Sequence, residues 1–140
     1  MPPDAAVAAW PAGLEELSLA GNQLEALPAG IGRLTSLSRL QLAGNQLAAL
    51  PDCVTGLASL QGLWLHGNLL QELPADLGSL AALTQLSLSG NCLRELPRGL
   101  SSLRGLQELS CAGNQLGALP ASIGGLAGLK KLSLHGNQLR

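Results

Sequence analysis

The two histidines are the side chains of this chain best suited to bind a metal. His66 and His135 occupy equivalent places in a recurring segment, "LWLHGN" and "LSLHGN", three copies apart. Adjacent strands lie about 4.8 Å apart, so two imidazoles that are three strands apart in a parallel sheet would be separated by roughly 14 Å. A shared zinc ion needs ligands within about 2 Å, and we therefore interpret both histidines as structural or surface residues.

The three cysteines are the residues that could form a covalent bond. Cys53, Cys92 and Cys111 fall at three different places of the recurring segment, which disfavours the Cα separation that a disulfide requires. We expect reduced thiols, which are typical of the cytosol; a redox or acylation role for Cys92 is the alternative. The glycine-containing "GIGRLT" lacks the third glycine of a dinucleotide fingerprint. We expect no catalytic site, no metal and no cofactor, and hence no enzyme.

The elements that position these residues recur every 23 residues. "LSLAGNQLEALP" begins at Leu17, and related segments return throughout the chain. The repeat places an asparagine at the same point of each unit: Asn22, Asn45, Asn68, Asn91, Asn114 and Asn137. Five complete units start at residues 14, 37, 60, 83 and 106, and a truncated sixth starts at residue 129. Such a fixed period indicates a repeat architecture.

Each unit predicts one short strand and one return segment. Apolar and polar residues alternate around Leu17-Ser18-Leu19, as in a strand with one buried face. Because a short strand cannot bury that face alone, equal spacing predicts a parallel sheet across the units. A proline then ends the strand region, and apolar residues spaced i, i+3, such as Ile31 and Leu34, predict a turn of 3₁₀ or α-helix.

The asparagines have a structural explanation in this arrangement. Each unit turns sharply after its strand, which leaves backbone groups without a sheet partner. A carboxamide offers both donors and an acceptor, so an inward-facing asparagine satisfies groups in its own turn and in the next one. We therefore expect a structural asparagine ladder through the stack. Gly-Asn as a β-hairpin signal is the weaker interpretation, because the constant period requires parallel strands.

The unit L-x-x-L-x-L-x-G-N-x-L-x-x-L-P-x-x-I-G-x-L-x-x-L resembles the leucine-rich repeat, specifically its 23-residue intracellular class. That class is seen in Ras-pathway scaffolds, plant Ras-group proteins and ROCO GTPases. The resemblance covers Leu14 to Arg140. It implies an α/β repeat solenoid: a right-handed superhelix with a concave parallel β-sheet and short 3₁₀, helical or irregular convex segments. It also implies recognition of protein partners on the concave face.

The expected domain organisation is a repeat domain over residues 14–140 behind a short lead. Residues 1–13 are expected to be irregular, with Trp10 as a partial cap. Neither end shows the capping modules of the resembled family, and the sixth unit stops part-way. Because capping repeats are normally required for solubility, we expect self-association through the uncapped ends.

Composition excludes several classes of partner. The net charge is −1 and 12% of residues are charged, so there is no electrostatic footprint for nucleic acid or an anionic membrane. No apolar run approaches the roughly 18 residues that would span a bilayer. The start, "MPPDAAVAAW", is a poor signal peptide because it has no basic n-region. A cytoplasmic location is expected.

The outward strand positions identify a candidate partner surface. Trp64 is expected in the middle of a face otherwise made of small or polar residues, either as a platform for Arg39, as an anchor for a partner or as neutral exposure. The expected contact residues are Trp64, His66, Gln41, Gln85 and Arg39. Cross-strand ion pairs are expected between Glu16 and Arg39 and between Glu108 and Lys131.

These observations favour a non-catalytic protein-protein interaction module, such as a scaffold or recognition domain in intracellular signalling. The alternative is a regulatory leucine-rich segment of a larger enzyme, such as a GTPase, kinase, cyclase or ubiquitin ligase. The partner's identity does not follow from the sequence, because specificity in a solenoid depends on scattered side chains.

Overall fold

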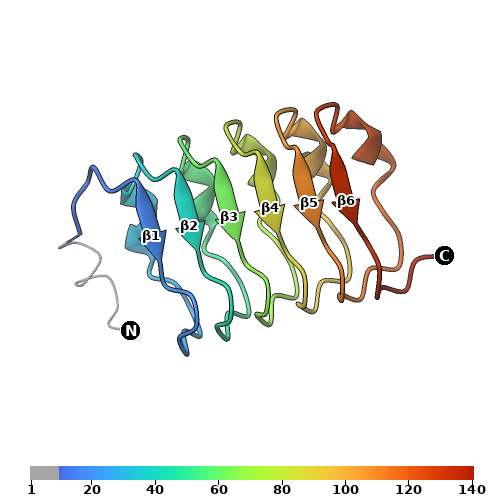
Figure 1. Ribbon diagram of the computed structural model, residues 1–140, viewed down its shortest axis with the longest axis horizontal. Helices are drawn as coiled ribbons and strands as arrows, with labels where there is room; N and C mark the ends of the chain where they lie inside the picture. Colours follow the sequence, from blue (N-terminus) through green and yellow to red (C-terminus); the bar gives the residue numbers. More distant parts are fainter. Residues whose placement is uncertain (1–9) are drawn as a thin grey trace.

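A parallel sheet runs the length of the molecule in the computed structural model, which describes residues 10–140. Within those residues each of six strands pairs with the next along the chain. The strands are β1 (Glu16–Ser18), β2 (Arg39–Gln41), β3 (Gly62–Trp64), β4 (Gln85–Ser87), β5 (Glu108–Ser110) and β6 (Lys131–Ser133). Figure 1 shows them side by side, with the helical segments behind the sheet. The predicted repeat solenoid is confirmed.

The register of the sheet follows the period of the sequence. Leu17 pairs with Leu40 and Leu40 with Leu63, a shift of one unit that continues through β6. The central residue of each strand points into the core, and Leu40 and Leu63 are fully buried. The two flanking residues of each strand therefore point to the opposite side, which we call the sheet face.

The return segments form short 3₁₀ helices. They are η1 (Ala29–Arg33), η2 (Asp52–Gly56), η3 (Leu77–Ser79), η4 (Arg98–Ser102) and η5 (Ala121–Gly125). Proline immediately precedes four of them in an extended conformation, for example Pro51 at φ −67° and ψ 146°. The exception is η3, which is shorter and follows Asp76. Its first residue still donates to a proline carbonyl, from Leu77 N to Pro74 O at 3.1 Å.

The core lies between the sheet and the 3₁₀ segments and consists almost entirely of leucine. The i, i+3 pair of each return segment contributes to it, and Val54 and Leu57 are both fully buried. Trp10 is partly buried against this core. The rest of the expected lead up to residue 9 lies outside the described residues. In the described part of the chain, no helix is long and apolar enough to cross a membrane.

The glycine before each asparagine is required by the backbone. The six glycines from Gly21 to Gly136 all have φ between +65° and +70°. This left-handed conformation is disfavoured for residues with a Cβ. It turns the chain out of the strand and places the next residue, asparagine, toward the neighbouring units.

Candidate partner-binding surface

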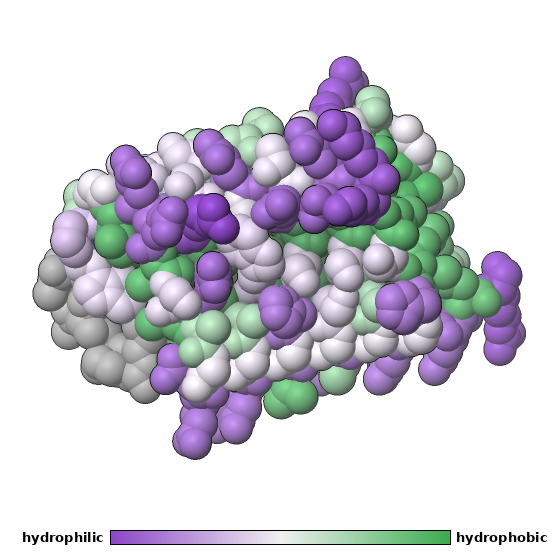
Figure 2. Space-filling view, viewed as in Figure 1, coloured by the Kyte–Doolittle hydropathy of each residue, from purple (hydrophilic) through white to green (hydrophobic). Residues whose placement is uncertain are grey.

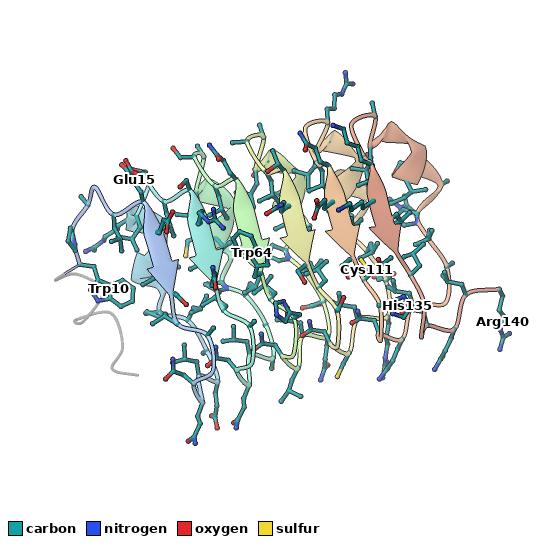
Figure 3. The ribbon with its side chains drawn as sticks, in the orientation of Figure 1. Trp10, Glu15, Trp64, Cys111, His135 and Arg140 are labelled. Atoms are coloured by element: carbon teal, nitrogen blue, oxygen red, sulfur yellow. The ribbon has the colours of Figure 1, made fainter. Side chains whose placement is uncertain are left out.

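The shared register arranges the outward side chains in rows across the sheet face. The first row contains Glu16, Arg39, Gly62, Gln85, Glu108 and Lys131. The second contains Ser18, Gln41, Trp64, Ser87, Ser110 and Ser133. Polar and small residues therefore surround one large aromatic ring, and Figure 3 shows Trp64 in the middle of the sheet.

The small neighbours of Trp64 suggested that its side chain projects freely from the sheet. The structure shows that it does not. Its ring lies back over Gly62, the preceding outward residue of its own strand. The space is available only because Gly62 has no side chain, since a Cβ there would overlap Trp64 Cη2. The Arg39 guanidinium lies over the indole with its Cζ 5.2 Å from the ring centroid, within the range of a cation–π contact. The platform for Arg39 is therefore present, and the ring is held from below and from the β2 side.

A hollow of about 230 Å³ opens beside the indole. It extends over β4, β5 and β6 and is bordered by Trp64, Gln85, Ser87, Glu108, Ser110 and Lys131. Arg39 stacks on the same ring but is not among the residues that border the hollow. The hollow thus combines an aromatic wall, hydroxyl groups and a carboxylate.

The polar groups of the hollow are held in place by their neighbours on the next strand. Ser87 Oγ shares a hydrogen bond of 3.1 Å with His66 Nδ1, and the hydroxyl groups of Ser89 and Ser110 are hydrogen-bonded to each other. His66 therefore supports the border of the hollow without lining it. These contacts fix the hydroxyl positions before any ligand is bound.

Two ion pairs lie on the first row, at the expected places. Arg39 Nε is 4.0 Å from Glu16 Oε1, and Lys131 Nζ is 3.5 Å from Glu108 Oε1. All four side chains are substantially exposed to solvent. Exposed pairs of this kind contribute about 0–1 kcal/mol to folding stability, so their charges remain available to a partner.

The predicted contact residues divide into two groups in the structure. Trp64 and Gln85 border the hollow, and Arg39 stacks on Trp64 from the β2 side. Gln41 is exposed and pairs in register with Trp64, while His66 acts on the hollow only through Ser87. Sequence reasoning missed Ser87, Ser110, Glu108 and Lys131 as borders of one hollow. One signal for a depression on this face was available in the sequence: strand alternation places Gly62, which has no side chain, on the same face as Trp64.

The asparagines lie on the core side of the turns and connect adjacent units. Asn68 Nδ2 donates to Leu42 O at 3.0 Å and to Leu65 O at 2.9 Å, while its Oδ1 accepts from Leu47 N at 3.1 Å. The same pattern recurs at Asn45, Asn91 and Asn114, which are all buried. Asn22 donates only within its own turn, to Leu19 O and Ala20 O.

The residues with covalent or metal chemistry remain apart. Cys53, Cys92 and Cys111 are free thiols, and Cys111 is fully buried in the core. Burial raises the pKa of the Cys111 thiol from 9.0 to about 12, because the charged thiolate is poorly solvated there. Over residues 10–140, no group of three or more His, Cys, Asp or Glu side chains is placed to hold a metal ion.

Comparison with known proteins identifies relatives by sequence and by structure. A family model described as leucine-rich repeat matches residues 12–70 and 63–116, which together exceed half of the chain. A leucine-rich repeat protein of Leptospira interrogans is similar in structure, with a TM-score of 0.91 and 42% identity over 92% of this chain and 33% of that one. No curated protein matches the chain by sequence.

Two plant receptors are also similar in structure. The ectodomain of the membrane receptor kinase GASSHO1/SCHENGEN3 of Arabidopsis thaliana, solved in complex with CASPARIAN STRIP INTEGRITY FACTOR 2, has a TM-score of 0.83 and 36% identity over 91% of this chain. A plant peptide hormone receptor, RGFR1 in complex with RGF2, has a TM-score of 0.83 and 32% identity over 90% of this chain. The chain spans 16% and 21% of these two receptor chains.

Proposed function

Because the chain belongs to the leucine-rich repeat family, we propose that it is a non-catalytic recognition module that binds a protein partner on its sheet face. The observation that carries this proposal is the indole of Trp64, fixed over Gly62 beside the hollow. Aromatic side chains held in a shallow depression are typical anchors at protein interfaces. A ring that is already immobilised also loses little conformational entropy on binding.

The similar structures support a protein or peptide as the partner. One of the plant receptors is a peptide hormone receptor solved with RGF2, and the other was solved with CASPARIAN STRIP INTEGRITY FACTOR 2. Each shares about a third of its aligned residues with this chain. An extended segment crossing the strands would contact Trp64, Arg39, Gln41 and Gln85.

The cellular role proposed here is that of a scaffold or recognition domain in intracellular signalling. Three free thiols in the described chain support an intracellular location, since the cytosol keeps cysteines reduced. We also propose that the chain associates with itself through two exposed leucines of the last unit, Leu132 in β6 and Leu139 after it.

Trp64→Ala tests the proposed surface. Peptides selected from a displayed random library against the wild-type chain would be measured for affinity to Trp64→Ala and to Glu72→Gln, an exposed substitution outside the sheet face. Loss of an interface anchor costs about 2 kcal/mol or more, so Trp64→Ala should weaken binding at least tenfold while Glu72→Gln leaves it unchanged. The melting temperature of Trp64→Ala should remain close to that of the wild type. Selected peptides that bind both variants equally would place the binding surface elsewhere.

A further inference from the structure

The Trp64 indole contacts Arg39 and also borders the hollow. The Arg39 guanidinium lies over the ring, with its carbon 5.2 Å from the ring centroid. The other residues that border the hollow belong to β4, β5 and β6. The π-electron surface of tryptophan attracts a cation more strongly than that of any other side chain. The part of the indole that borders the hollow therefore offers a second contact for a cation besides Arg39.

Across the hollow from the indole, the border supplies hydrogen-bond acceptors. Glu108 contributes a carboxylate, Gln85 an amide oxygen, and Ser87 and Ser110 contribute hydroxyl oxygens. Figure 2 shows hydrophilic side chains gathered along the upper edge of this face toward the β6 end. An ammonium or guanidinium group between the ring and Glu108 would meet an aromatic face on one side and a carboxylate on the other.

Among residues 10–140, Lys131 is the one cation that borders the hollow, and it is weakly held. Its Nζ lies 3.5 Å from Glu108 Oε1, and its side chain is 74% exposed while that of Glu108 is 44% exposed. An exposed pair of this geometry contributes at most about 1 kcal/mol. A ligand cation that also contacts Trp64 can therefore displace Lys131 from Glu108, and Lys131 then returns to solvent.

We propose that the hollow beside Trp64 receives a basic side chain, lysine or arginine, of the partner's extended segment. This inference rests on the proposed function, because it names the chemistry that the sheet face recognises. An acidic side chain would meet both the Glu108 carboxylate and the negative face of the ring. An apolar side chain would cover the Glu108 carboxylate without offering it a hydrogen bond or an opposite charge, which is unfavourable.

The competition for Glu108 gives the proposal an unusual signature. Glu108→Gln removes the carboxylate and should weaken binding. Lys131→Gln removes the competing cation and should strengthen binding, although it alters the same ion pair. If the ligand group were acidic, both substitutions would act in the opposite direction, since Lys131 would then be the attractive group.

The test uses the selected peptides with each basic residue replaced in turn by an uncharged analogue, norleucine for lysine and citrulline for arginine. One replacement should reduce affinity about tenfold, consistent with a cation–π contact combined with an ion pair. The same peptide should lose a similar factor with Glu108→Gln and gain about two- to threefold with Lys131→Gln. Glu72→Gln and Lys130→Gln, matched charge removals away from the hollow, should have no effect.

Three other outcomes would overturn the inference. If Trp64→Ala abolishes binding but no basic residue of the peptides matters, the proposed function stands and the proposed ligand chemistry is wrong. If Lys131→Gln weakens binding, the hollow recognises an acidic group. If no library peptide binds the sheet face, both the proposed function and the ligand chemistry are wrong.

Discussion

At the scale of single residues, Asn68 is the best place to measure what the asparagine ladder contributes. Its side chain is 4% exposed and makes three hydrogen bonds to the backbone of two units. Asn68→Ala should lower the free energy of unfolding by about 1–3 kcal/mol, because buried backbone groups lose their partners. Asn22→Ala is the internal control, since Asn22 is exposed and bonds only within its own turn. Equal urea midpoints for the two variants would contradict the ladder's structural role.

Cys111 is a second residue whose environment has a measurable consequence. Burial keeps its thiol uncharged up to a pKa of about 12, and only the thiolate is nucleophilic. Iodoacetamide at pH 8 should therefore spare Cys111 in the folded chain and modify it after unfolding in urea. Mass spectrometry of the alkylated peptides would show this directly.

The raised pKa of the Cys111 thiol also predicts a loss of folding stability at alkaline pH. The unfolded chain ionises this thiol above its ordinary pKa of 9.0, whereas the folded chain keeps it protonated. The stabilisation is therefore complete below about pH 9 and declines as the pH rises toward 12. Between pH 8 and pH 10.5 the wild type should lose about 2 kcal/mol more than Cys111→Ala. Parallel losses in the two proteins would contradict the assignment to this thiol.

At the scale of elements, two glycines of the same unit perform different tasks. Gly67 lies in the turn after β3 with φ +70°, and a Cβ there would make only ordinary contacts. Gly67→Ala should therefore cost about 1–2 kcal/mol through backbone strain alone. Gly62 lies in β3, where a Cβ would overlap the Trp64 ring. Gly62→Ala should leave the urea midpoint nearly unchanged, because the end of a side chain can move aside.

Fluorescence distinguishes these two effects. In a Trp10→Phe background, Trp64 is the remaining tryptophan of the chain. Gly62→Ala should shift its emission by moving the ring off the strand and away from Arg39, whereas Gly67→Ala should leave the emission of the folded protein unchanged. An unaltered spectrum for Gly62→Ala would mean that the ring does not rest on Gly62 in solution.

The repeat elements were predictable from sequence because one spacing determines them all. A 23-residue period and a Leu-x-Leu alternation predict parallel strands in one register, with Leu17 opposite Leu40. That register is present. The i, i+3 apolar pairs predicted the helical segments, η3 included, although not that η3 is shorter and follows Asp76. The orientation of Trp64 could not be predicted in the same way. The orientation of the Trp64 ring depends on Gly62 and on Arg39 of the neighbouring strand. Neither residue recurs at the same place in the other units.

At the scale of the whole molecule, stability depends on contacts between adjacent units. In such a solenoid each unit packs only against its neighbours, so the units at the two ends bury less of their apolar surface. Leu63, in the middle of the stack, is fully buried, whereas its equivalent in β6, Leu132, is 42% exposed. Leu139 is 40% exposed on the same unit. These side chains offer apolar surface to a second copy of the chain.

We therefore expect the 140-residue chain to self-associate reversibly through the face formed by β6 and the turn after it. Sedimentation velocity should show a weight-average coefficient that rises with concentration over tens of micromolar. A Leu132→Lys and Leu139→Lys double variant should remain monomeric, because burying two lysines between copies is costly. Leu69→Ser removes an equally exposed leucine, 51% exposed, from the middle of the stack and should not affect association. If Leu69→Ser also abolished association, the contact would depend on general surface hydrophobicity. A wild type that stays monomeric would show that the β6 face does not attract a second copy.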